Sequence, residues 1–248
     1  MKETKVAFIN DEQLKAYFSE YIQFTEHVEQ LCYAIRSKER KIFGQPVTPI
    51  VDIPDMKKMV VNVTWLLIQH IQQHMESDAP GLQIEVLDVL KKTGVADDSG
   101  MISEITEHKL VKIRNFLVEK YTGNSGKQIA LHQNADRLRC FFGLRGKTKK
   151  SVFFLPGFVR RLKDERFLLE IAETMRHIML ALISFAQFAG HTKLEQELRA
   201  LTDQTYFVFE GRDTIELSGL SIQLCQKGLN FHFSPEISPT FQKFLEIQ

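Results

Sequence analysis

Apolar side chains recur at helical spacing through the first 121 positions of the chain. Between Asn10 or Asp11 and about Arg40 they stand mostly three, four and seven positions apart, which is typical of a long amphipathic helix. The same period, with capping and turn residues between the runs, predicts three more helices in this half. They are expected over residues 52–78, 82–92 and 103–121.

The pattern changes after residues 122–128, where two Gly, an Asn and a Ser mark a boundary. Beyond it, short apolar runs or alternating polar and apolar positions predict strands. These strands are expected over 137–142, 150–155, 206–209, 214–217, 220–224 and 229–233. Helices are expected over about 160–189 and 194–201, with a short last one from Ser238.

Because the strands cluster instead of alternating with helices, we expect an antiparallel sheet and an α+β fold that is predominantly helical. The long predicted helix over 160–189 is apolar enough to lie centrally among the strands and hairpins of the C-terminal half. We expect a helical domain or half over residues 1–122 and a mixed α+β domain over 129–248, unless the two form one continuous domain.

Composition supports a folded globular protein without a membrane partner. The chain has 248 residues, 44% of them hydrophobic, and its 32 basic residues nearly balance its 31 acidic ones. The N-terminus does not have the pattern of a signal peptide, and the most apolar stretch, 178–188, is too short to span a bilayer. Three widely separated cysteines favour free thiols. We therefore expect a cytoplasmic location.

The charge is locally uneven, because residues 137–161 contain eight Lys or Arg, five Phe and no acidic residue. This segment is predicted to form a hairpin in which Arg137, Arg139 and Phe141 share the solvent face. Cations with an exposed aromatic ring suit single-stranded nucleic acid, since cations pair with phosphates and aromatic rings stack on bases.

The leading hypothesis is therefore a non-catalytic protein that binds nucleic acid or another polyanion through the basic hairpin. The predicted binding residues are Arg137, Arg139, Phe141, Arg145, Lys147, Lys149, Lys150, Arg160 and Arg161.

Two other classes of function remain open. The basic segment could instead dock an acidic protein, in which case the chain is an interaction or assembly subunit. The heptad-like spacing of the first helix, with Glu20, Glu26 and Glu29 between its apolar residues, is compatible with a homo-oligomer. The third class is an enzyme whose site is assembled from distant residues and leaves no local motif.

Local motifs nominate no catalytic residue, metal or cofactor. The stretch "GLRGKT" resembles a phosphate-binding loop, but Phe141 stands where that motif requires Gly. His70 and His74 have the spacing of a helical metal pair, yet Ile71 occupies the position of the Glu that a zinc hydrolase needs, and no third ligand is indicated.

Overall fold

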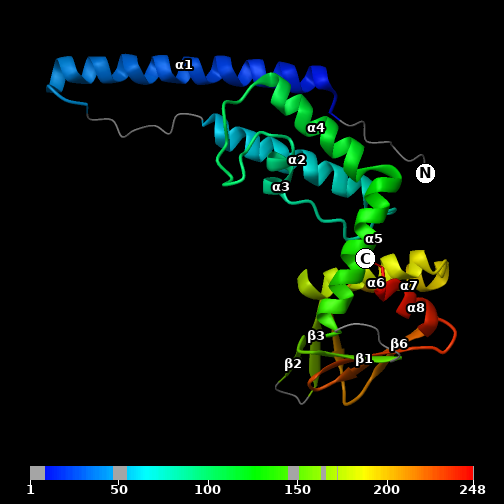
Figure 1. The fold of residues 1–248 in the computed structure, drawn as a ribbon. Helices are drawn as coiled ribbons and strands as arrows, with labels where there is room; N and C mark the ends of the chain where they lie inside the picture. Colours follow the sequence, from blue (N-terminus) through cyan, green and yellow to red (C-terminus); the bar gives the residue numbers. More distant parts are fainter. Residues whose placement is uncertain (1–8, 47–54, 145–150, 163–165, 172, 248) are drawn as a thin grey trace, which may run out of the picture. The chain divides into compact units, whose positions relative to one another are not determined.

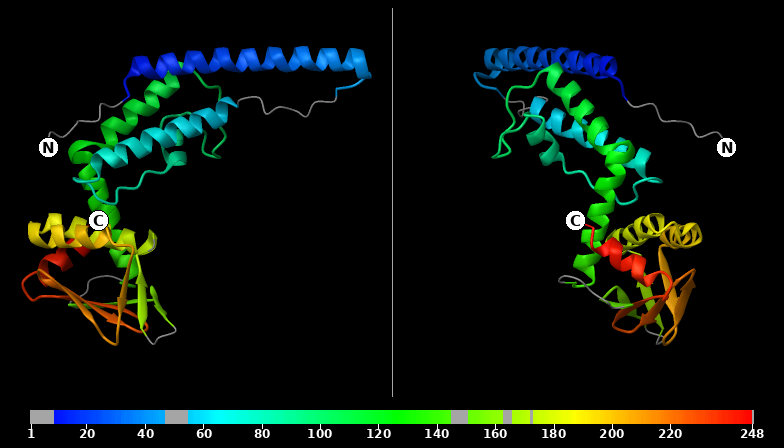
Figure 2. Two further views of the ribbon diagram at one scale, coloured as in Figure 1. Left: turned by 180° about the vertical axis from the view of Figure 1, so that it is seen from behind. Right: turned by 45° about the vertical axis from the view of Figure 1, so that its right-hand side comes forward.

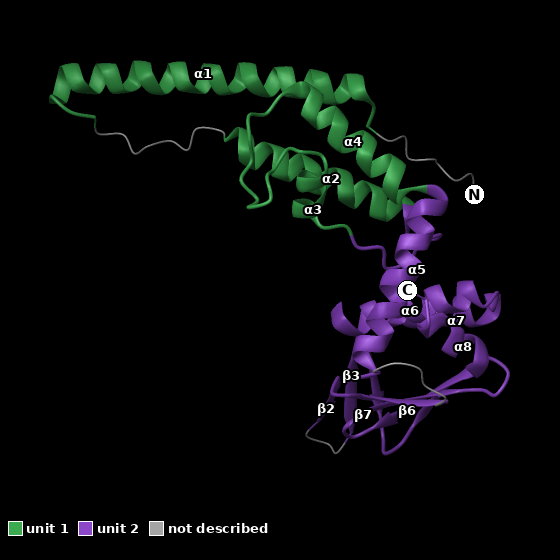
Figure 3. Cartoon of the chain, in the orientation of Figure 1, with its two compact units in different colours: residues 1–74, 84–122 green, residues 75–83, 123–248 purple. Residues whose placement is uncertain are grey.

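The computed structural model describes residues 9–46, 55–144, 151–162, 166–171 and 173–247. The chain divides into two compact units (Figure 3). Unit 1 comprises residues 1–74 and 84–122, and unit 2 comprises residues 75–83 and 123–248. The fold is α+β and 58% helical, which confirms the predicted class. Independent folding of two domains stays a prediction.

Unit 1 is built from helices, as its apolar spacing predicts (Figure 1). The predicted start of the second helix at Asp52 lies outside the described residues. The core of the unit comes from the last three helices, in which Val60, Val89 and Leu110 are fully buried. The helices are α1 (Asp11–Phe43), α2 (Met56–Met75), α3 (Val86–Lys92) and α4 (Glu107–Tyr121).

Helix α1 has clear signals at both ends. The Asn10 side chain accepts a hydrogen bond from the backbone N–H of Gln13 at 2.8 Å, and the Gln13 side chain accepts one from the backbone N–H of Asn10 at 2.9 Å. This capping box satisfies two donors that a helix start otherwise leaves unpaired. The helix ends at Gly44, whose φ of 75° lies in the left-handed region that glycine adopts without strain.

Unit 2 combines four helices with two antiparallel sheets. A four-stranded sheet has the order β1-β7-β6-β5, and a three-stranded sheet has the order β2-β3-β4. The helices are α5 (Gly123–Phe141), α6 (Glu173–Phe188), α7 (Thr192–Thr202) and α8 (Ser238–Leu245). The strands are β1 (Val152–Pro156), β2 (Val159–Arg161), β3 (Phe167–Glu170), β4 (Tyr206–Phe209), β5 (Thr214–Leu217), β6 (Leu220–Cys225) and β7 (Gly228–Phe233).

The four strands predicted after residue 205 are confirmed, and their alternating side chains face a core rich in phenylalanine. Helices α6, α7 and α8 lie on one side of the strands (Figure 2). Phe241 of α8 stacks on Phe233 with ring centroids 3.9 Å apart and meets Phe185 of α6 at 4.9 Å. Such aromatic pairs stabilise a core beyond the area they bury.

Two sequence predictions in unit 2 are wrong. Residues 137–142 are not a strand, because all but the last belong to α5, and the basic hairpin therefore does not exist in the predicted form. In α5 the buried residues Ala130, Asn134 and Leu138 are four apart, so the apolar positions of 137–142 continue a helical stripe. The described residues 160–162 and 166–170 are likewise not helical, because they contribute to β2 and β3, and helix α6 begins only at Glu173.

Candidate functional site

Arg137 is a structural residue of unit 2 rather than a solvent-facing cation. Its Nη1 donates a hydrogen bond to Oδ1 of Asn134 at 2.6 Å and lies 3.4 Å from the carbonyl oxygen of Gly81. Asn134 is fully buried and donates from Nδ2 to the carbonyl oxygen of Pro80 at 2.7 Å. Burial lowers the pKa of Arg137. Arg137 and Asn134 together hold the 80–81 loop against α5.

Arg139 fastens the end of the chain to α5. Its Nη1 donates to the carbonyl oxygens of Leu245 and Ile247, the latter at 2.8 Å, and its Nη2 pairs with Asp136. Phe141, predicted as a stacking platform, is half-buried against the core of unit 2. The three residues predicted to share one strand face therefore have separate structural environments.

The remaining predicted contacts divide into two groups. Arg145, Lys147, Lys149 and Lys150 lie outside the described residues. Arg160 and Arg161 are exposed on β2, an edge strand of the three-stranded sheet. Within the described ranges, the structure thus leaves only this pair of the predicted residues both adjacent and exposed.

A second candidate surface lies on α1, where a seven-residue apolar repeat runs along the helix. We call this set the heptad face. Its first positions are Leu14, Tyr21, Val28, Ile35 and Ile42, and its fourth positions are Tyr17, Phe24 and Leu31. A repeat of this kind, with apolar residues at the first and fourth positions, is the pattern by which helices pair side by side.

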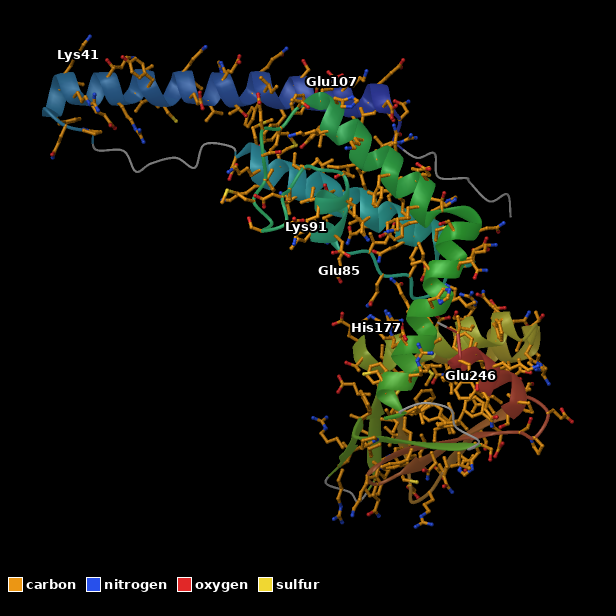
Figure 4. All side chains as sticks on the ribbon, in the orientation of Figure 1. Lys41, Glu85, Lys91, Glu107, His177 and Glu246 are labelled. Carbon is orange, nitrogen blue, oxygen red and sulfur yellow. The ribbon has the colours of Figure 1, made fainter. Side chains whose placement is uncertain are left out.

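Among the described residues of unit 1, α1 is buried only near its beginning, where it contacts α4. Arg114 of α4 donates from Nε to the carbonyl oxygen of Ile9 at 3.0 Å and pairs with Asp11 at 3.5 Å. Lys15 pairs with Glu107 at 3.4 Å, where α4 begins (Figure 4). Leu14 and Phe18 are the buried residues of α1.

Beyond Phe18 the heptad face is half-buried at Tyr21 and Val28 and exposed at its other apolar positions. Phe24 is 57% exposed, Leu31 is 51% exposed and Ile42 is 71% exposed. No residue of α1 after Phe18 reaches the buried class, and side chains stand out from the helix along its length to Lys41 (Figure 4). At about 1.5 Å per residue, this section extends over roughly 37 Å. An exposed apolar stripe of that length marks an interaction surface.

Tyr17 and Phe24 belong to the heptad face, although no binding role is predicted for them from the helical spacing. The repeat of seven positions is visible in the sequence and could have identified them. The repeat does not show whether these side chains are exposed, because a helix buried inside a unit can carry the same repeat.

The described part of the chain was also searched for a metal site and for a membrane-spanning helix. Among those residues, no group of three or more His, Cys, Asp or Glu is arranged to hold a metal ion. No helix in the described ranges is both long and apolar enough to cross a membrane.

Comparison of the chain with protein-family models, curated proteins and solved structures gives no match. The functional argument therefore rests on the geometry of the two surfaces. All residues of the heptad face lie in the described part of the chain, whereas four of the predicted basic residues lie outside it.

Proposed function

We propose that the protein is a non-catalytic assembly subunit that self-associates through the heptad face of α1. The observation that carries this proposal is the apolar repeat from Phe24 to Ile42, which is exposed at every apolar position except the half-buried Val28. An isolated helix in water is only marginally stable, and most helices are held by packing of their apolar face. A second copy of α1 offers a matching stripe and would remove both stripes from water.

Sedimentation equilibrium of the full chain over a range of concentrations tests this proposal. We expect the mass of a dimer. A triple variant, with Phe24, Leu31 and Ile35 each replaced by Gln, should give the mass of a monomer and retain a helical circular dichroism spectrum.

The matched control is Tyr33→Gln. Tyr33 is 78% exposed, more than any of the three replaced residues, but it lies off the heptad face. Its replacement should therefore leave the dimer intact. A wild-type chain that remains monomeric at every concentration would refute the proposal, and so would a control that dissociates as fully as the triple variant.

Polyanion binding through the basic segment is a second candidate function. It is favoured by the exposure of both Arg160 and Arg161 on an edge strand, and by the four cations that precede β1 in the sequence. This candidate surface does not include Arg137, Arg139 or Phe141, because the side chains of these residues are partly buried within unit 2. A dimer would carry two such segments, which increases the charge presented to a nucleic acid.

Binding to single- and double-stranded DNA and RNA across a salt series tests the second candidate. Each phosphate contact should contribute a slope of about −0.7 to −0.9 in the logarithm of affinity against the logarithm of salt concentration. Replacing Arg145, Lys147, Lys149 and Lys150 by Ala should abolish most of that slope. Absence of binding at low salt would exclude nucleic acid and leave an acidic protein as the ligand for these cations.

We also propose a cytosolic location for the assembly. Cys32, Cys140 and Cys225 are free thiols, which are typical of a reducing compartment. Oxidation of the purified chain to a disulfide-linked form that is more stable than the reduced one would argue against this location.

A further inference from the structure

We infer that two copies of α1 pair in antiparallel orientation, so that the acidic part of each helix lies beside the basic part of the other. This inference rests on the proposed self-association and specifies its geometry. The acidic part is residues 20–29 and the basic part is residues 36–41. Both belong to the section of α1 that follows the last buried residue, Phe18.

The charge along α1 is strongly polarised. The acidic part contains Glu20, Glu26 and Glu29 without a Lys or Arg, whereas the basic part contains Arg36, Lys38, Arg40 and Lys41 with one Glu. Parallel pairing would place acid beside acid and base beside base. Antiparallel pairing places unlike charges side by side, which favours association and fixes direction.

Lys38 gives a second argument for antiparallel orientation of the two helices. It is the one charged residue at the first and fourth positions of the heptad repeat in α1. It occupies the fourth position, seven residues after Leu31, and it is exposed in the single chain. In a parallel dimer in register, Lys38 would face the same residue of the second copy at the centre of the interface. A polar residue at such a position is known to select one register and orientation over others.

One antiparallel register satisfies the apolar residues and the charges together. When Val28 lies opposite Leu31 of the second copy, Phe24 lies opposite Ile35, and Lys38 lies opposite Tyr21. The Tyr21 ring can accept a cation on its face. The same register brings Glu20 beside Lys41 of the second copy, and symmetry repeats each contact.

Charges at the two ends of α1 also stabilise the helix by itself, because acidic residues in the first turn and basic residues in the last turn interact favourably with the helix dipole. This effect needs no partner and does not depend on which residues face each other. A test of the inference must therefore report pairwise proximity between copies rather than the stability of α1.

Disulfide trapping between full-length chains provides that report. In a background with Cys32, Cys140 and Cys225 changed to Ser, one chain carries Phe24→Cys and a second, distinguishable by an added tag, carries Ile35→Cys. We expect the mixed 24–35 disulfide to form at least about tenfold faster than 24–24 or 35–35, since only the mixed pair lies opposite in the antiparallel register.

The outcomes separate this inference from the proposed function. A dominant 24–24 disulfide in a chain of dimeric mass would overturn the antiparallel orientation and leave self-association standing. A monomeric mass of the unmodified chain would overturn both. Because the two cysteines are on separate chains, a 24–35 disulfide can form only between chains and not within one chain.

Charge reversal tests the register without touching the apolar residues. Glu20→Lys and Lys41→Glu should each raise the dissociation constant of the dimer about 2- to 30-fold, because two symmetric ion pairs are lost, and the double variant should restore it. Glu26→Lys is the control, because Glu26 lies off the heptad face and should have little effect. Failure of the double variant to recover affinity in a dimeric chain would overturn the register.

Discussion

Replacing Arg139 by Gln should destabilise unit 2 and leave any affinity for nucleic acid unchanged. The Arg139 guanidinium donates to the carbonyl oxygens of Leu245 and Ile247, and its side chain is only 24% exposed. A hydrogen bond with a charged partner contributes about 1.5–3 kcal/mol to the free energy of unfolding, and this contribution is lost when the bond is removed. Since two bonds are lost but water can reach the chain end, we expect a net loss of about 1.5–3 kcal/mol in the free energy of unfolding.

The assay must follow each unit separately, and the sequence offers a simple way to do so. Trp65 is the single tryptophan and lies in α2, so its fluorescence follows unit 1. Hydrogen exchange in peptides covering α8 follows unit 2, because exchange reports the free energy of local opening. Arg139→Gln should speed exchange at α8 and leave the fluorescence transition in urea unchanged.

The matched control is Arg160→Gln, on the exposed edge strand β2. It should change stability by no more than about 0.5 kcal/mol, as exposed substitutions do, and should weaken nucleic-acid binding if the second candidate function holds. The reasoning fails if Arg139→Gln leaves exchange at α8 unaltered while reducing nucleic-acid affinity more than Arg160→Gln does.

Three further predictions concern the interface, a histidine and a glycine. Leu31→Ala should raise the dimer dissociation constant about 10- to 100-fold in sedimentation, because half of each Leu31 side chain remains to be buried in both copies, while Tyr33→Ala should not. Burial and the charge of Arg137 lower the pKa of His177 below its usual 6.5, so the unfolded chain takes up the proton more readily. The stability from neutral His177 is therefore present above pH 6.5 and is lost as pH falls toward the folded-state pKa. His177→Gln should reduce the slope of urea midpoints against pH below about pH 7 and change it little above. Gly228→Ala should cost about 3 kcal/mol by thermal unfolding, since its φ is 155° and a Cβ there would overlap the carbonyl oxygen of Leu155; wild-type stability would contradict this.

The sequence was sufficient where local signals agree with the packing. The strand β6 alternates buried and half-buried residues along its whole length, from Leu220 to Cys225. Gly219 lies between β5 and β6, and Gly228 begins β7. Helix α1 begins at a capping box that can be read from Asn10 and Gln13 alone. In both cases the information that decides the structure lies within a few residues.

The helical conformation of residues 137–141 could not be predicted from such local signals. The six residues 137–142 alternate between polar and apolar over the first four positions, but they also fit the four-residue spacing of a helix, so the window alone does not distinguish a strand from a helix. Partners far along the chain separate the alternatives. The Asn134 amide reaches Pro80, 54 positions away, and Arg139 reaches Ile247, 108 positions away. A count of charges over the segment does not show that two of its arginines donate hydrogen bonds to backbone carbonyl oxygens.

The contrast between α1 and α6 explains why the heptad face is significant. Both helices carry apolar residues at helical spacing, but in α6 the stripe from Met175 to Ala186 is buried among the sheets and the other helices of unit 2. In α1 the stripe is buried only at Leu14 and Phe18, where α4 contacts it. Because an apolar surface left in water is unfavourable, this difference between two similar patterns is the basis of the proposed self-association of α1. In the proposed dimer a second copy provides the matching stripe, and the opposite charges at the two ends of the exposed section favour the antiparallel orientation.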